Sequence, residues 1–537
     1  MPFKPNASTR GRRERPTAGA DAPPNVSDTE EHAAKVSRFT GWYVVALCLI
    51  GAGRVFVGAA GLPLFNDVDE REHFDLVHKF ARGYWPGKTL DPMDQETVLI
   101  QTFYGSPEYL NDPGPDGFPP PLWSWPSSAE KNAYARQLLT LFSGQVNHEA
   151  HSPPVYYATA ALWYDLGRLA GLRGPAAAYW VRFLNAPLYA ALIAAAYAFC
   201  RAYFSAVVAW TVPALIAFFP NTLFFSVTDD VLSPLLGLLA VCFFLRWQTR
   251  PLRGGWSAVL VGLMLAATVL VKLTNVAILA ACLLVLLVRG YRAWRAGRFR
   301  EEWCPALLLV LAAVGPVLLW MLRNKLVLGD FTGTAAKIEY LTWRRKPFGE
   351  WFHHPLFSPK GQIYFWTHLI PAFYNGDMSW HSRALMQFAL SDWFFIGTFA
   401  ALPVAGLVSW VGRRRPGLGR GRGRFHLAGG LSALVVIASV LVLILLSVQF
   451  DFGKSFYPTQ QHPYFISGRL IAGALVPFLA LYVCSVEVLT GRLKSFLVGT
   501  LALSVVMLVL PQMIAAAEIL PSQYNWFHLP SSQPVAQ

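Results

Sequence analysis

The segment Asn66-Asp67-Val68-Asp69-Glu70-Arg71-Glu72-His73-Phe74 follows the first long apolar stretch of the chain. It carries four carboxylates in a protein in which only 14% of the residues are charged. If a helix begins at Glu70, Asp69 is its N-cap and Glu72 completes a capping box. The same spacing places Asp69, Glu72 and His73 on one helical face, which suits an acidic site at the start of a helix. Local spacing allows both interpretations.

The composition indicates a membrane protein. Hydrophobic residues make up 54% of the chain, the mean hydropathy is +0.38, and the apolar residues occur in runs of roughly 18 to 25, long enough to cross a bilayer. The net charge of +14 comes from basic residues in the N-terminal region and in short loops between apolar runs. That distribution is typical of positive-inside topology and does not indicate a nucleic-acid partner.

The six cysteines lie in or beside hydrophobic segments. We therefore expect neither a disulfide framework nor a cysteine-based zinc site. The sequence shows no internal repeat of the kind found in inverted-repeat transporters.

The apolar runs predict an all-α polytopic protein with about eleven crossings. Residues 1–38 form a disordered basic cytoplasmic tail, and residues 39–515 form the transmembrane domain. Positive-inside counting makes 153–170 a re-entrant or juxtamembrane segment. The expected crossings are 41–63, 178–200, 204–225, 230–247, two short helices within 256–289 that meet at Lys272, 305–322, 393–411, 427–448, 466–485 and 493–514.

Two long polar loops are expected on the outer face. The first, 64–152, holds the acidic segment, juxtamembrane helices and a helix over about 128–143, and the second is 323–390. Long loops between spans are more often functional than idle. We expect a multi-pass protein of the inner (plasma) membrane of a bacterium, with a cytoplasmic N-terminus and a periplasmic C-terminal tail, 516–537.

This topology gathers charged side chains and imidazoles on the outer face. Carboxylates beside cations suit a reaction on a phosphate-bearing lipid, in which one acid deprotonates an acceptor hydroxyl and the cations or a metal stabilise the departing phosphate. The residues gathered are Asp67, Asp69, Glu70, His73, His148, Glu149, His151, Asp229, Asp230, Arg323, Lys325 and Arg469.

Each group also has a simpler interpretation. His148-Glu149-x-His151 resembles a metal-ligand spacing but lacks the HExxH pattern of helical zinc sites. Asp229 and Asp230 can cap the helix that follows them. Lys272 can extend its ammonium toward the membrane interface, and Arg469 can pair with an acid of the loop. Arg323 and Lys325 can be ordinary interfacial anchors.

A series of motifs in chain order resembles the GT-C superfamily of membrane glycosyltransferases, and within it the protein-mannosyltransferase, aminoarabinose-transferase and related bacterial branches. Asp69-Glu70-x-x-His73-Phe74 resembles the acidic motif of the first outer loop. Glu149-Ala150-His151-Ser152-Pro153-Pro154-Val155-Tyr156-Tyr157 resembles the entry to the next membrane segment. The series continues with Thr228-Asp229-Asp230, Lys272-Leu273-Thr274, and Leu322-Arg323-Asn324 with Gly329-Asp330.

The resemblance implies a GT-C-like fold and an inverting transfer from a polyprenyl-phosphate sugar at the periplasmic face. Asp69 is then the general base and Glu70 a supporting acid, while Lys272 and Arg469 hold lipid phosphate. Glu149 and His151 then touch the donor or a divalent metal. The chain departs from the mannosyltransferase pattern in its basic second outer loop and in lacking a recognisable soluble C-terminal domain, so the sugar and the acceptor stay open.

Two other classes of function remain. A lipid or glycolipid flippase needs charges at mid-membrane and repeat symmetry, whereas the charges here concentrate in outer loops. A non-catalytic scaffold that binds a partner through Trp-rich loops predicts that Asp69→Asn leaves function intact. A glycosyltransferase predicts near-complete loss of function with normal expression.

Overall fold

The computed structural model describes residues 26–249, 255–385, 387–412, 421–455, 457–490 and 493–530. The chain divides into two compact units, Met1–Val45 and Ala46–Gln537, and the second holds every element from α2 to η8. Helix α1 (Val26–Gly61) begins inside the tail that was expected to be disordered. Residues 30–35 are mostly good helix formers, which favours this earlier start.

The chain is a multi-pass helical membrane protein. In the part that the structure describes, nine helical segments are long and apolar enough to cross a membrane. They are Phe39–Gly61, Gly174–Tyr203, Asp229–Thr249, Leu273–Arg295, Trp303–Leu328, Ala389–Val408, Gly423–Gln449, Gly468–Thr490 and Lys494–Ile519.

Two further apolar helices are shorter than these segments. Helix α8 (Ala206–Ala217) has 12 residues and α10 (Gly255–Val271) has 17. At 1.5 Å per residue, α8 is about 18 Å long, against a hydrocarbon core of about 30 Å. The crossing predicted over 204–225 is therefore wrong in extent, because Pro220 and the N-cap Asn221 start a separate 3-10 turn, η2 (Thr222–Phe225).

Some of these segments are single helices and others join two shorter elements. The first elements are α6 (Gly174–Phe183), α7 (Asn185–Tyr203), η3 (Asp229–Val231), α9 (Ser233–Thr249), η4 (Leu273–Asn275), α11 (Val276–Arg295) and α12 (Phe299–Leu328). The later elements are α15 (Ala389–Phe399), α16 (Ala401–Gly412), α17 (Gly421–Gln449), η7 (Gly468–Ala474), α18 (Leu475–Thr490) and α19 (Lys494–Ile519). The Arg-rich stretch predicted to be cytoplasmic lies largely outside the described residues, at 413–420.

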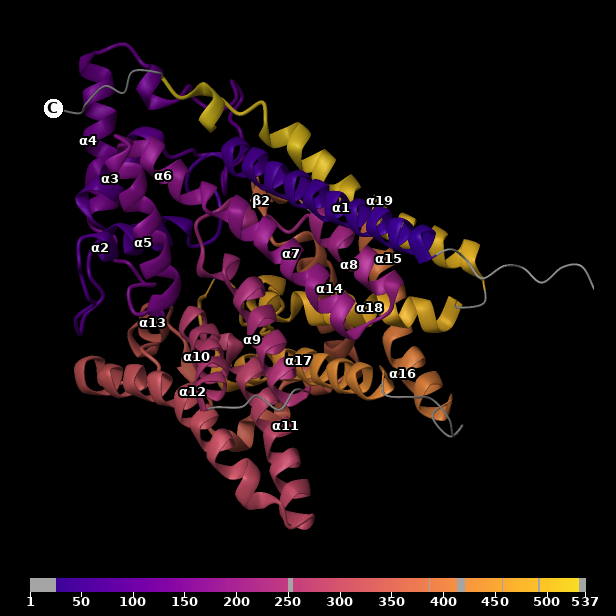
Figure 1. Cartoon of the computed structure of the whole chain (residues 1–537). Coiled ribbons are helices and arrows are strands. Elements are labelled where there is room, and N and C mark those ends of the chain that lie inside the picture. Colours follow the sequence, from indigo (N-terminus) through magenta and orange to yellow (C-terminus); the bar gives the residue numbers. More distant parts are fainter. Residues whose placement is uncertain are drawn as a thin grey trace, which may run out of the picture. The chain divides into compact units, whose positions relative to one another are not determined.

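The first long loop folds into helices. These are α2 (Glu70–Ala81), α3 (Gln95–Tyr104), η1 (Leu122–Ser124) and α4 (Ala129–Ser143), and α5 (Pro154–Leu169) follows the loop. Helix α4 agrees with the prediction, and Ser128 caps it by accepting a hydrogen bond from the Lys131 backbone N–H. Helices α2, α3, α5 and α6 pack together through a buried apolar cluster that includes Phe74, Val77 and Tyr157, and α4 packs on α3 (Figure 1). Helix α5 is not among the candidate spans, in line with the predicted juxtamembrane segment.

The second long loop is also folded. It holds α13 (Ala335–Tyr340), β1 (Arg344–Arg345), η5 (Phe348–His353), η6 (Pro355–Phe357), α14 (Pro359–Asn375), β2 (Ser379–Trp380) and β3 (Arg383–Ala384). Strand β1 pairs antiparallel with β4 (Phe450–Asp451), and β2 pairs with β3. The described strands are only two residues long, so the architecture is helical, as predicted. The last element, η8 (Trp526–His528), follows α19.

The helix breaks at η4 and η7 lie close together at a glycine of η7. The predicted break at Lys272 separates α10 from η4 and α11. Asn275 in η4 donates hydrogen bonds to Ser233 Oγ and to the Thr268 carbonyl, both at 3.0 Å. Gly473 of η7 lies so close that a Cβ there would be 2.3 Å from Asn275 Oδ1. The η4 and η7 turns, with Lys272 and Arg469 on them, therefore meet.

Candidate functional site

The acidic segment starts helix α2 without capping it. Helix α2 begins at Glu70, as predicted, and Asp69 occupies the N-cap position with a left-handed backbone (φ 59°). The Asp69 side chain makes no capping hydrogen bond, so the capping-box interpretation is wrong. The carboxylate instead turns toward two distant side chains.

Those two partners are His148 and Arg469. His148 Nε2 lies 3.2 Å from Asp69 Oδ1, and the Arg469 guanidinium donates to Asp69 Oδ2 at 3.1 Å. Burial by itself raises the pKa of Asp69, but the His148 hydrogen bond and the charges of Lys337 and Arg469 together hold that pKa well below its usual range. Asp69 is therefore an ionised carboxylate at neutral pH. The predicted pairing of Arg469 with a loop acid is confirmed.

Glu149 has its own cation. Lys337, from α13, forms an ion pair with Glu149 Oε1, and Ser152 Oγ donates to Glu149 Oε2 at 2.7 Å. Although burial opposes it, the Lys337 charge lowers the pKa of Glu149. Burial lowers the pKa of His148, yet its hydrogen bond to Asp69 outweighs that effect and leaves the pKa raised. The His148 ring also stacks on Tyr340, with centroids 5.6 Å apart.

A further ion-pair group is centred on Lys272. Lys272 Nζ lies 2.8 Å from Asp229 Oδ1 and 2.6 Å from Asp230 Oδ1. Arg469 reaches Asp230 at 3.8 Å. The N-cap of η3 is Thr228, whose side chain accepts from the Asp230 N–H. Asp229 and Asp230 thus serve as partners of Lys272, which corrects both the capping interpretation of these acids and the interfacial interpretation of Lys272.

These groups line one polar cavity of about 180 Å³. Its walls come from the start of α2, the segment before α5, the η4 break, the loop before α13, and η7. Eight of the residues predicted from the sequence line it: Asp69, His73, His148, Glu149, His151, Asp229, Lys272 and Arg469. Three cations and three carboxylates thus share a small space. Each lysine ammonium has three N–H donors, so a lysine that is paired with one carboxylate can still donate to a ligand.

Three predicted acids are not part of the cavity lining: Glu70, Asp67 and Asp230, the last of which contacts the lining residue Lys272. Glu70 is buried and forms a two-pronged ion pair with Arg182, with both N–O distances 2.6 Å. It also accepts from the backbone N–H groups of Phe65 and Val227. Glu70 therefore fixes the start of α2 and does not face the cavity. Asp67 accepts from Ser226 Oγ at 2.6 Å, and burial raises its pKa.

The structure does not bring the two predicted cations of the second loop to the cavity. Helix α12 continues to Leu328, so Arg323 and Lys325 are helical. Arg323 donates to the Pro86 carbonyl at 2.5 Å, and its guanidinium lies over the Trp85 ring. Lys325 donates to the Gly329 carbonyl. Neither side chain is among those that line the polar cavity.

Asp69, His148 and Glu149 are the described residues whose geometry could hold a metal ion. Their ligand atoms lie within 4.8 Å of one another. His151, which the sequence groups with them, places its Nε2 3.1 Å from the Gly87 carbonyl instead. Two carboxylates and an imidazole suit a divalent cation chemically. Lys337 and Arg469 already pair with those carboxylates, so a bound dication would share the carboxylates with these two side chains.

Sequence reasoning missed three residues of the site and its support. Lys337 is one of many basic residues of the second loop, and no local pattern distinguishes it. Arg182 lies in an apolar helix, and only its charge there is a signal. Tyr157 was quoted within a motif, but its hydrogen bond to His73 Nδ1, at 2.7 Å, was not foreseen.

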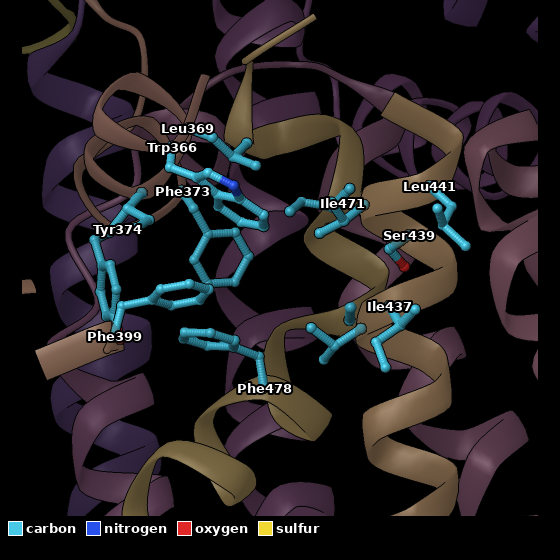
Figure 2. Close-up of a pocket in the computed structure, with 14 residues that line it drawn as sticks. Trp366, Leu369, Phe373, Tyr374, Phe399, Ile437, Ser439, Leu441, Ile471 and Phe478 are labelled. Carbon is cyan, nitrogen blue, oxygen red and sulfur yellow. The ribbon is translucent and has the colours of Figure 1, made fainter. Parts of the chain in front are cut away.

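The structure also has an apolar cavity of about 270 Å³, and consecutive residues of η7 line this cavity and the polar one. Leu470 lines the polar cavity, and its neighbour Ile471 lines the apolar one. Figure 2 shows rings such as Phe373, Phe399 and Phe478 on one side and aliphatic side chains of α17 on the other. Helices α14, α15, α17 and α18 supply most of this lining together with η7.

No protein-family model and no curated protein sequence matches the chain. Solved structures of an oligosaccharyltransferase from Archaeoglobus fulgidus are similar. The structure of AglB in complex with an inhibitory peptide and a dolichol-phosphate has a TM-score of 0.42 and 13% identity over 90% of this chain, as does the apo form. The form tethered to an acceptor peptide containing the NVT sequon has a TM-score of 0.39 and 14% identity. This chain covers 56% of the archaeal chain in each case.

Proposed function

We propose that the protein is an inverting glycosyltransferase that moves a sugar from a polyprenyl-phosphate donor to a hydroxyl acceptor. The observation that carries this proposal is the polar cavity, where the ionised Asp69 carboxylate lies among Arg469, Lys272 and Lys337. A base beside several cations is what a displacement with a phosphate leaving group requires. We further propose that the cavity faces the periplasm.

The reaction is a single displacement. The acceptor oxygen attacks the anomeric carbon while Asp69 accepts the hydroxyl proton. The bond between that carbon and the phosphate oxygen breaks, and polyprenyl phosphate leaves with the electron pair. Arg469, Lys272 and Lys337 stabilise the negative charge on the departing phosphate, since charge-assisted hydrogen bonds to phosphate are strong.

The other predicted residues have supporting roles in this proposal. Glu70 holds the start of α2 in place through Arg182, and His148 orients the Asp69 carboxylate. A divalent metal held by Asp69, His148 and Glu149 would add positive charge beside the leaving phosphate. The apolar cavity beside η7 suits the isoprenoid chain of the donor, because an aromatic and aliphatic lining offers burial to hydrocarbon.

The first test measures transfer of radiolabelled sugar from a panel of polyprenyl-phosphate sugars in proteoliposomes. Asp69→Asn removes the base and is expected to lower turnover about 10²- to 10⁴-fold with unchanged expression and melting temperature. Asp165→Asn, an exposed aspartate of α5, is the matched control and should turn over like the wild type. An EDTA arm measures metal dependence.

One outcome would reject the proposed base, and another would reject the enzyme. If Asp69→Asn turns over donor like the wild type, Asp69 is not the base. If the wild type moves lipid across the bilayer without consuming any donor of the panel, the protein is a flippase.

A further inference from the structure

A third cavity, of about 620 Å³, is also lined by Asp69. Its lining shares Asp69, and no other residue, with the lining of the polar cavity. In an inverting displacement, the nucleophile and the leaving group lie on opposite sides of the anomeric carbon. A base that lines two separate cavities can therefore serve the acceptor in one and the donor phosphate in the other. This cavity has the size of a small-ligand site, for which roughly 300–1,000 Å³ is typical.

The walls of this third cavity lie outside the candidate membrane spans. They come from the start of α2, the end of α3 with the loop after it, the Pro- and Trp-rich segment around η1, α4, and Tyr524. Tyr524 holds this wall together, because its hydroxyl donates to the Pro119 carbonyl at 2.7 Å. An acceptor bound there is reached from the polar loops and not from the bilayer.

One wall carries a stacked pair of aromatic rings. The rings of Trp125 and Tyr134 have centroids 5.6 Å apart and planes within 8° of parallel. Trp125 is held in place on both sides, since its Nε1 donates to the Pro120 carbonyl at 2.9 Å and its own carbonyl accepts from Lys131 Nζ at 2.9 Å. Flat rings fixed in one orientation suit the C–H faces of sugar rings, because such faces are apolar while the rim of hydroxyls is polar.

The polar groups of the cavity complement hydroxyls. Gln101 lines it, and the Gln101 Oε1 atom is buried without a hydrogen-bond partner in the described part of the chain. An unmet acceptor of this kind is costly unless a ligand donor reaches it. Asn111 adds an amide, and Arg71 and Glu72, 2.5 Å apart, add charged donors and acceptors. Hydroxyls both donate and accept, so a sugar can satisfy such a mixed set.

We propose that the Trp125–Tyr134 pair and Gln101 form a carbohydrate-binding platform, so that the acceptor is a glycan or a glycosylated molecule whose sugar ring lies in this cavity. This assignment rests on the proposed transferase function. It adds a substrate class that the polar cavity does not reveal.

The test uses the full-length protein in lipid nanodiscs and saturation-transfer-difference NMR. The probes are a panel of methyl glycosides of common pentoses and hexoses, and a soluble peptide with Asn, Ser and Thr side chains. We expect at least one methyl glycoside to receive saturation on its ring C–H protons. Trp125→Ala and, separately, Tyr134→Ala should weaken that binding roughly three- to tenfold, while Trp125→Phe, which keeps a ring, should retain most of it.

Phe352→Ala is the matched control, because Phe352 is an exposed aromatic residue of η5 that does not line the cavity. It should bind like the wild type. Melting temperatures show whether each alanine variant is folded, and Tyr134→Ala replaces Trp125→Ala if the latter is not.

The platform is rejected if no methyl glycoside binds, or if sugars bind equally well to the folded alanine variants. Binding of the peptide alone would identify a polypeptide acceptor instead. These outcomes are separate from failure of the transferase proposal, which is read from donor consumption by the wild type and Asp69→Asn.

Discussion

Arg469 is the residue on which the polar cavity depends most. Its guanidinium contacts Asp69 directly and lies 3.8 Å from Asp230, so it joins the proposed base to the Lys272 ion pair. Lys337 plays the same part for Glu149 from another element. Each carboxylate of the cavity thus has a cation that a phosphate can also bind. In the proposed function, exchange of these partners lets a charged donor enter without leaving a buried charge unpaired.

Lys337→Gln removes one of these cations. Because hydrogen bonds to charged groups contribute about 1.5–3 kcal/mol, the KM for the polyprenyl-phosphate sugar should rise about tenfold or more, with a smaller change in kcat. Lys325→Gln is the control, since Lys325 lies on α12 away from the cavity lining. The measurement is steady-state transfer at varied donor concentration. Equal KM values for the two variants would remove Lys337 from the donor site.

Arg182→Met tests the buried support of α2. Arg182 is fully buried, pairs with Glu70, and donates to the carbonyls of Ala59, Leu62 and Pro63. Its loss leaves Glu70 as an uncompensated buried charge, which costs about 3–5 kcal/mol. We expect a marked drop in melting temperature in detergent, together with loss of activity.

The exposed pair Arg82–Asp94 provides the comparison for this variant. Arg82 is 64% exposed and lies 2.8 Å from Asp94. Surface pairs contribute about 0–1 kcal/mol, so Arg82→Met should melt close to the wild type. If Arg182→Met is as stable as Arg82→Met, the buried pair does not hold α2.

Among the elements, η7 connects the polar cavity with the apolar cavity. It carries Arg469 into the polar cavity and Ile471 into the apolar one. Its backbone is irregular at Ile471 (φ −113°, ψ 17°), where the 3-10 turn passes toward α18. Two glycines allow this placement, since Gly473 contacts Asn275 and Gly468 contacts the backbone of α14. Side chains at these positions would force η7 away.

Gly468→Ala tests this element. A Cβ at Gly468 would lie 2.2 Å from the Phe373 Cα, a backbone atom that cannot move alone, so η7 has to shift and carry Arg469 away from Asp69. We expect at least a tenfold loss of transfer, since small displacements of binding groups cost about 10²-fold in rate. Gly499→Ala in α19, where a Cβ meets nothing within 4 Å, should be active and as stable as the wild type. Full activity of Gly468→Ala would contradict the role of η7.

For the whole molecule, the proposed orientation places the two long folded loops on one side of the membrane and the basic end of α11 on the other. The stretch 289–300 is rich in arginine, and such loops stay in the cytoplasm. Both proposed substrate cavities then open to the periplasm, where lipid-linked donors and envelope acceptors meet.

Cysteine labelling checks this orientation. Lys88→Cys and Lys360→Cys place exposed thiols in the first and second long loops, and Arg295→Cys places one at the end of α11. A membrane-impermeant maleimide should label the first two in intact cells, and Arg295→Cys only after permeabilisation, with the wild type as the blank. The reverse pattern would place the site in the cytoplasm.

The sequence by itself determined the parts of this protein that depend on local pattern. Apolar run length predicted the helical membrane architecture and the break at Lys272, and the acidic segment predicted a helix beginning at Glu70. Eight of the predicted side chains do line one cavity. These features follow from hydropathy and helix periodicity, which are read within about twenty residues.

Only the tertiary structure decided which charges meet. Asp69 and Arg469 are 400 positions apart, and Glu149 and Lys337 are 188 apart. It also assigned Glu70 to a buried ion pair and left Arg323 and Lys325 outside the cavity. Spacing along the chain cannot choose among 45 lysines and arginines for each acid, because that choice is made by how helices far apart in the sequence pack.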